Sequence, residues 1–118
     1  MFDFEKLEVY QKAKDFNKVS HQFILQNKLD RTTKDQLRRA SFSIMLNIAE
    51  GCSRYTKPDR KNFYVIARGS VFECIAIFDF LREENLMEET LYKECYSKAE
   101  ELSKMIDRKS TRLNSSHV

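Results

Sequence analysis

The sequence predicts an all-α protein, an antiparallel up-down-up-down four-helix bundle. The 118 residues include only two Gly and one Pro, while 33% are charged, and a β-rich chain needs more turn formers. Four segments of about 20 residues carry apolar side chains at helical spacing. Because the breaks between them are short, consecutive helices should lie side by side in opposite directions. A chain of this length has room for one core.

The first helix is expected over about residues 6–26, which the segment "NKLDRTT" ends. Its apolar face alternates spacings of four and three residues: Val9, Ala13, Phe16, Ser20 and Phe23. Thr33 and Gln36 form a plausible capping box, so the second helix is expected over about residues 34–53.

The break "RYTKPD" precedes the third helix, expected over about residues 59–84, with Pro58 in its opening turn. After the turn "NLMEE", the fourth helix is expected over about residues 88–106. Its near-heptad apolar row consists of Leu91, Cys95, Ala99, Leu102 and Ile106.

The last twelve residues, "DRKSTRLNSSHV", interrupt this pattern and are rich in Ser. Residues 107–117 resemble the translation of a widely used sequencing-library adapter. We therefore expect a bundle domain over residues 1–106, a non-native or disordered tail over residues 107–118, and a missing natural C-terminus. The tail holds three basic residues and one acidic residue, so without it the net charge falls from +3 to +1. Overall basicity is thus no indication of a nucleic-acid partner.

The second and third helices carry more apolar surface than a single bundle can bury. One stripe of the second helix consists of Leu37, Ser41, Ile44 and Ile48, and another of Phe42, Met45, Leu46 and Ala49. The broad first stripe of the third helix consists of Phe63, Ile66, Ala67, Ser70, Cys74, Ile77, Phe78 and Leu81. Nearly opposite lie Val65, Gly69, Phe72, Ala76 and Phe80.

Only one stripe of each helix can face the core of its own bundle. Soluble monomers rarely leave a contiguous apolar patch in water, so we expect the second stripes to pack against another copy of the chain. The alternative is that the third helix is simply a buried central helix. The residues expected at the interface are Phe42, Met45, Leu46, Val65, Gly69, Phe72 and Ala76.

A narrow polar row separates the two stripes of the second helix: Arg39, Ser43, Asn47, Glu50 and Arg54. Arg68 and Glu73 lie beside small residues in the third helix. Ionisable groups between buried stripes should be paired, because an uncompensated buried charge is costly. An ion-pair network between helices or subunits is one interpretation, and a ligand or nucleic-acid site is the other.

Charge is segregated along the chain. Residues 34–68 hold eight basic and three acidic side chains, whereas residues 83–101 hold seven Glu and two Lys. Such segregation is typical of a phosphate-binding face, and Tyr55 and Tyr64 could stack on bases. The alternative is that the basic helices pair with the acidic fourth helix. The candidate nucleic-acid contacts are Lys34, Arg38, Arg39, Arg54, Lys57, Arg60 and Lys61.

The sequence argues against an enzyme. His21 is the only histidine outside the tail, and Lys18 stands where a di-iron Glu-x-x-His motif would need its Glu. Three isolated cysteines without a CxxC pair indicate reduced thiols in a cytoplasmic protein, with no zinc site. Cys52 is a candidate reactive thiol, but a helix C-terminus disfavours the thiolate. Neither a secretory signal nor a membrane-spanning segment is visible.

The segments "LEVYQKA", "RRASFSIMLNIAEGCSR" and "FYVIARGSVFE" resemble four-helix-bundle proteins of the 23S rRNA intervening-sequence type. These are small bacterial proteins, some encoded within insertions in large-subunit ribosomal RNA genes. The resemblance implies an antiparallel bundle assembled into a homopentameric ring. It also implies kinship with the accessory protein of diversity-generating retroelements, which engages a reverse transcriptase and nucleic acid. By position, the residues that match the family signatures are Asn47, Glu50, Gly51, Arg54, Ala67, Arg68, Gly69, Ser70 and Glu73.

From the sequence we expect a cytoplasmic, non-catalytic oligomer without a cofactor or metal. Its expected role is to bind the RNA or DNA backbone through the basic second and third helices. The alternative is a protein-interaction scaffold or an accessory subunit, for example of a reverse transcriptase, with no nucleic-acid contact of its own.

Overall fold

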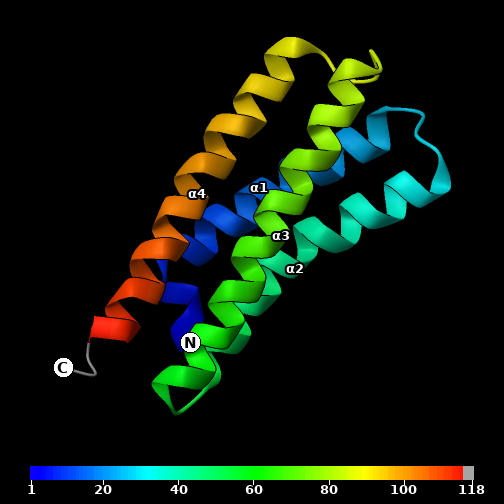
Figure 1. The fold of residues 1–118 in the computed structure, drawn as a ribbon. Coiled ribbons are helices and arrows are strands. Elements are labelled where there is room, and N and C mark those ends of the chain that lie inside the picture. Colours follow the sequence, from blue (N-terminus) through cyan, green and yellow to red (C-terminus); the bar gives the residue numbers. More distant parts are fainter. Residues whose placement is uncertain (116–118) are drawn as a thin grey trace.

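The computed structural model describes residues 1–115, and every regular element within them is helical (Figure 1). A short 3-10 helix, η1 (Asp3–Lys6), precedes the four main helices. These are α1 (Glu8–Gln26), α2 (Arg31–Ser53), α3 (Lys57–Glu83) and α4 (Glu89–Ser115). The all-α class and the four-helix bundle are confirmed.

Each helix packs beside its neighbours in the chain, and α4 closes the bundle against α1. The N-terminus, the α2–α3 turn and the C-terminal end of α4 lie at one end of the molecule (Figure 1). The α1–α2 and α3–α4 turns lie at the other end. The direction of the chain therefore alternates from helix to helix, as an up-down-up-down bundle requires.

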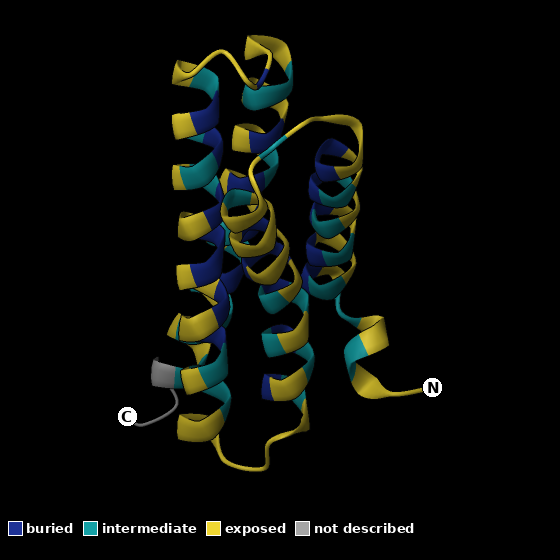
Figure 2. Ribbon diagram, turned by 90° about the vertical axis from the view of Figure 1, so that its right-hand side faces the viewer, coloured by how far each residue is buried: buried dark blue, intermediate teal, exposed yellow. Residues whose placement is uncertain are grey.

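The core forms where the apolar rows of all four helices meet, on the inner sides of the ribbons (Figure 2). Phe78 of α3 lies at its centre, with ring centroids 6.3 Å from Phe16 and 5.8 Å from Phe23, both in edge-on geometry. The predicted first stripe of α2 is fully buried, as are Cys95, Ala99, Leu102 and Ile106 of α4. Helical periodicity alone therefore identified the core face of these helices.

Side-chain caps set the first residues of α2 and α3. The carboxylate of Asp30 accepts a hydrogen bond from the Thr33 amide at 3.1 Å, so α2 begins one turn earlier than the predicted Thr33 cap. The two hydrogen bonds from Thr33 also lower the pKa of Asp30. Thr56 Oγ1 caps α3 by accepting from the Asp59 amide at 3.3 Å, with Pro58 in the first turn as expected.

Helix α4 continues well beyond the predicted end of the bundle domain at Ile106. Its extension contains no Gly or Pro to stop it, and two contacts hold it to the bundle. The Asp107 carboxylate lies 2.6 Å from Arg68 Nε of α3, and Leu113 packs against the core. Residues 107–115 are therefore helical where the sequence predicts a tail outside the fold. Residues 116–118 of that segment lie outside the described residues.

Candidate functional site

The second apolar stripe of α3 lies on the outside of the bundle. We call it the α3 strip, and it consists of Val65, Gly69, Phe72, Ala76 and Phe80. The Phe72 and Phe80 side chains are 53% and 57% exposed, although helical spacing places them on one continuous face. Helix α3 is therefore not a buried central helix. Ile66, which the sequence placed on the core face, is also 49% exposed, because that predicted stripe is too wide for the bundle to cover.

The expected interface residues of α2 do not form one surface. Leu46 is 52% exposed on the outer face of α2. Met45 is only half exposed and packs against the core. Phe42 is 40% exposed but turns toward α1, where it lines a groove of about 350 Å³ together with His21 and Arg38. Only Leu46 thus shares the outward exposure of the α3 strip.

The two glycines of the signatures have opposite surroundings. Gly51 is buried where α2 meets α3, and a Cβ there would lie 3.1 Å from Phe63 Cβ and 3.3 Å from the Arg60 carbonyl oxygen. Gly69 has nothing within 4 Å of the equivalent position. Gly51 therefore lets the two backbones approach closely, whereas Gly69 leaves open space beside the α3 strip.

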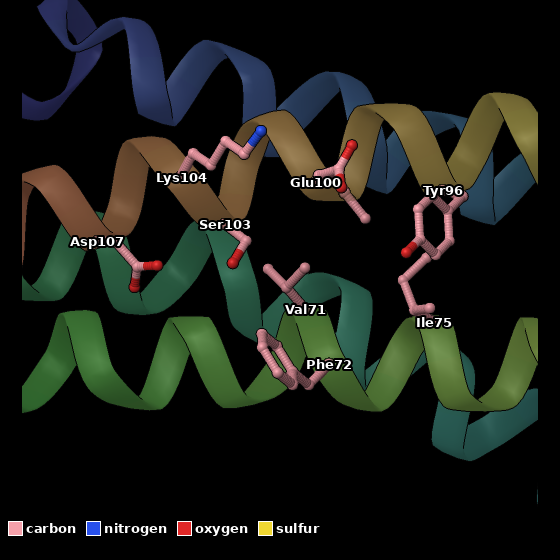
Figure 3. A pocket seen from close by; sticks show the side chains of 9 residues that line it. Val71, Phe72, Ile75, Tyr96, Glu100, Ser103, Lys104 and Asp107 are labelled. Atoms are coloured by element: carbon pink, nitrogen blue, oxygen red, sulfur yellow. The ribbon is translucent and has the colours of Figure 1, made fainter.

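A groove of about 380 Å³ runs between α3 and α4 (Figure 3). Its apolar floor and walls come from Val71, Phe72, Ile75, Tyr96 and Ala99. Its polar rim, all from α4, comes from Glu100, Ser103, Lys104 and Asp107. The sequence does not predict this groove, because the α4 residues Tyr96, Glu100 and Lys104 lie beside the core row and form no apolar stripe of their own.

The signature polar residues are not brought together into one network. Asn47 Nδ2 donates to the Ser43 carbonyl and hydroxyl oxygens, and the Ser70 hydroxyl bridges α3 to Ser43 Oγ at 2.9 Å. Arg54 and Glu50 form a pair within α2 at 3.5 Å. Arg68 pairs with α4, as described above, and its guanidinium lies 4.5 Å from the Phe72 ring centroid. The Ser43–Ser70 hydrogen bond joins α2 to α3 and the Arg68 ion pair joins α3 to α4, whereas the contacts of Asn47 and the Glu50–Arg54 pair stay within α2.

The predicted basic face divides into two groups at opposite ends of α2. Arg38 and Arg54 are separated by about 24 Å along the helix axis, at 1.5 Å per residue. Lys34, Arg38 and Arg39 lie in the N-terminal half of α2, where Arg38 contacts His21 Nδ1. The second group surrounds the α2–α3 turn, and we call it the basic turn: Arg54, Lys57, Arg60 and Lys61. Counting charge along the sequence could not reveal this separation.

The basic turn has a defined geometry. Arg60 Nε donates to the Arg54 carbonyl oxygen at 2.7 Å, and the Arg54 guanidinium lies 4.6 Å from the Phe63 ring centroid. Tyr55 at the tip of the turn is 99% exposed. Tyr64 is buried, and burial raises the pKa of its phenol, so the prediction that it stacks on bases is wrong.

Of the basic residues counted in residues 34–68, Arg68 pairs with α4, through Asp107, and two further acidic residues of α4 pair elsewhere. Glu101 lies 3.1 Å from Lys12 of α1, and Glu89 lies 3.6 Å from Arg82 of α3. Lys98 of α4 pairs with Asp15 of α1 at 3.0 Å, which raises the pKa of Lys98. Among the ion pairs of the described residues, none joins α4 to Arg54, Lys57 or Arg60.

The thiols differ in accessibility. Cys74 and Cys95 are buried, and burial raises the pKa of both, that of Cys95 to about 11. Cys52 is half-buried near the end of α2. Residues 1–115 contain no cluster of three or more side chains suited to hold a metal ion. Within the same residues, no helix is both long and apolar enough to cross a membrane.

These features define a four-helix bundle with an uncovered apolar face and a basic turn. The family model described as "23S rRNA-intervening sequence protein" matches residues 5–108, and the chain belongs to this family. A solved structure from Bacteroides thetaiotaomicron, a protein of unknown function from the S23 ribosomal protein family, shares the fold with a TM-score of 0.80. It is 19% identical, and the alignment covers 86% of this chain and 97% of that chain. No curated protein matches the sequence.

Proposed function

We propose that this protein is a non-catalytic, self-assembling bundle that binds the phosphate backbone of RNA or DNA through its basic turn. The observation that carries the proposal is the gathering of Arg54, Lys57, Arg60 and Lys61 around one turn with a fully exposed tyrosine at its tip. Cations attract phosphates, and the exposed Tyr55 ring offers a stacking surface for an unpaired base.

The basic turn favours backbone contacts over base readout. The first turn of α3 adds the positive end of its helix dipole to the same site. Glu50 and Asp59 offset part of this charge, so a single copy should bind weakly. Neither acid blocks Lys57, which is exposed at the start of α3. Binding by such a site should be salt-sensitive and nearly independent of sequence.

Self-assembly would strengthen this weak site. The α3 strip, with Leu46 and Ile66 beside it, is the kind of exposed apolar surface that associating proteins cover. In a ring whose axis runs along the bundles, every basic turn would lie on one rim, and several weak contacts would act together. The copy number that the family resemblance implies is five, and the proposed site of action is the cytoplasm.

Fluorescence anisotropy with a labelled single-stranded RNA of about 30 nucleotides tests the proposal across a salt series. Lys57→Glu should weaken binding. It should also reduce the magnitude of the slope of log K against log[salt] by about one, because one phosphate contact is lost. Lys34→Glu carries the same charge change at the opposite end of α2 and is the matched control. An equal loss in both variants, or no binding at low salt, would overturn the proposed site.

A second candidate function is a protein-interaction scaffold or accessory subunit, for example of a reverse transcriptase. The exposure of the α3 strip favours it, because that surface needs a protein partner whether or not nucleic acid binds. Gly69→Arg fits the open space of a single copy but should block any partner on the strip. If this variant stays as massive as the parent by light scattering, the strip is not the assembly surface. A chain that assembles through the strip but never binds RNA would favour the scaffold.

A further inference from the structure

We infer that the groove between α1 and α2 binds a small phosphate monoester joined to a planar ring, as in a mononucleotide. The side chains of this α1/α2 groove that carry the inference are Asn17, Lys18, His21, Arg38 and Phe42. The groove lies away from the basic turn, since Arg38 and Arg54 are separated by about 24 Å along α2. It therefore adds a second site to the molecule and does not depend on the proposed binding of RNA or DNA.

Two contacts between α1 and α2 hold the side chains of the groove in place. Arg38 of α2 contacts His21 Nδ1 of α1. About one helical turn further along, Ser41 Oγ of α2 donates to Asn17 Oδ1 of α1 at 3.0 Å. Lys18 follows Asn17 on α1 and lines the same groove. Polar side chains from two antiparallel helices thus converge on one space.

The α1/α2 groove is positively charged, and no acidic side chain lines it. Its cations are Lys18 of α1 and Arg38 of α2. Within residues 1–115, neither of them forms an ion pair with a carboxylate. Asp35, the acidic residue nearest to Arg38 in the sequence, lies 4.0 Å from Arg31 instead. Since two cations without a counter-ion repel each other, an anion in the groove would be stabilised by both.

The hydrogen-bonding groups that these contacts leave available are mainly donors. A guanidinium only donates, so His21 Nδ1 accepts from Arg38 and the imidazole proton lies on Nε2, where it is a donor. The side-chain oxygen of Asn17 accepts from Ser41, which leaves the Asn17 amide nitrogen to donate. The Lys18 ammonium also donates only. A phosphate monoester carries negative charge and acceptor oxygens, so it complements this set, whereas a metal cation would find few oxygen ligands.

Phe42 provides the surface for the second part of the ligand. Its exposed ring lines the groove one turn along α2 from Arg38. A planar base can stack on such a ring, as bases do on exposed aromatic side chains. The volume of about 350 Å³ lies within the range of small-molecule sites, so the groove has room for a ring beside the phosphate. A mononucleotide therefore uses more of this groove than inorganic phosphate does.

NMR titration of the protein with AMP, inorganic phosphate and adenosine tests the site. AMP should bind with a Kd below about 1 mM and should shift the amide signals of the groove residues. Inorganic phosphate and adenosine should each bind at least about fivefold more weakly, because each offers only one half of the ligand. Phe42→Ala should weaken AMP by about fivefold or more and leave inorganic phosphate within about twofold of the parent. If Phe42→Ala leaves AMP binding unchanged, the assignment of a planar ring is wrong.

Two substitutions test the cations of the groove. Arg38→Gln and Lys18→Gln remove one positive charge from each helix at exposed positions, which the fold should tolerate. Each should weaken AMP binding by about tenfold through loss of a charge-assisted hydrogen bond. Arg39→Gln is the matched control and should bind AMP like the parent, because it makes the same charge change at an exposed neighbour that does not line the groove. No binding of AMP at low salt, or an equal loss in all three variants, would overturn the site.

Competition separates this site from the basic turn. AMP should not displace a labelled RNA that ends in a 5′-hydroxyl, and Lys57→Glu should retain AMP binding. Displacement of that RNA by AMP at concentrations that fill the groove would overturn a separate site. A chain that binds AMP but no RNA would overturn the proposed function and leave this inference standing.

The end group of the RNA identifies the source of the phosphate monoester. An RNA with a 5′-phosphate that binds more tightly than its 5′-hydroxyl counterpart, and loses this advantage in Arg38→Gln, would place the monoester at the end of a strand. Equal binding of the two RNAs, with AMP bound in the groove, would assign the site to a free nucleotide.

Discussion

Replacing Gly51 by alanine tests the close approach of α2 to α3. Two effects oppose each other at this position. Alanine favours the helix over glycine by about 1 kcal/mol, because glycine loses more backbone freedom on folding. The new methyl group, however, would lie 3.1 Å from Phe63 Cβ and 3.3 Å from both the Arg60 carbonyl oxygen and Tyr64 Cε1.

The packing effect should win. Phe63 Cβ and the Arg60 carbonyl belong to or adjoin the backbone of α3, so they can retreat only if the helix moves. Tyr64 is itself buried and has little room to turn. Overpacking of this kind costs about 1–3 kcal/mol, which exceeds the gain in helix propensity. We expect Gly51→Ala to lower the free energy of unfolding by about 1 kcal/mol.

Gly69→Ala is the matched control, because the same substitution on α3 meets open space. It should raise the free energy of unfolding of a single copy by up to about 1 kcal/mol. The two variants should thus differ by about 2 kcal/mol, or about 8 °C in Tm for a domain of this size. Urea denaturation followed by circular dichroism, repeated over a protein dilution series, separates this difference from changes in assembly. If Gly51→Ala stabilises the protein as much as Gly69→Ala does, the close-approach explanation is wrong.

Four further predictions concern the core, a helix cap and, in two cases, the thiols. Phe78→Ala should lower the free energy of unfolding, measured by urea denaturation, by about 4 kcal/mol, because it leaves a cavity at the centre of the core. A loss below about 2 kcal/mol would contradict that placement of Phe78. Thr56→Ala should cost about 1 kcal/mol through loss of the α3 cap, and Thr56→Ser should recover most of it. In the native state a thiol reagent should modify Cys52 alone, and fast labelling of three thiols would refute the burial. Burial raises the folded-state pKa of Cys74 and Cys95. The free energy of unfolding should therefore be unaffected by these thiols below about pH 8.5 and should fall as the pH rises toward 11. The fall should be less steep in Cys95→Ala.

The fold could be predicted because helical periodicity carries most of the information in this chain. The α2 row ending at Ile48 and the α4 row ending at Ile106 are buried as expected, since a 3.6-residue repeat defines one face of a helix. Helix ends were less predictable, because two capping residues compete at the start of α2 and Asp30 prevails over Thr33. The extension of α4 was missed because its Ser-rich composition hides the absence of any helix breaker.

The candidate sites were predictable only in part. A surplus of apolar positions identified Phe72 as a surface residue, because one helix can bury only one stripe. Tyr64 was misplaced, since a tyrosine within a basic segment can equally face the core. The division of the basic residues and the α3/α4 groove depend on contacts between helices. Lys57 and Lys34 are close in sequence, but α2 carries them to opposite ends of the molecule.

The α2 signature has a structural interpretation that connects it to the proposed binding site. Gly51 lets α3 approach α2 closely enough for the Phe63 ring to lie against the Arg54 guanidinium. The Arg54 carbonyl oxygen then accepts from Arg60 Nε, which ties Arg60 to the turn that carries Arg54 and Tyr55. A methyl group at position 51 would lie 3.1 Å from Phe63 Cβ and 3.3 Å from the Arg60 carbonyl oxygen, so the residues that hold these cations would have to shift. Glycine at this position therefore serves both packing and the geometry of the basic turn, so a substitution there should weaken nucleic-acid binding even where the bundle still folds.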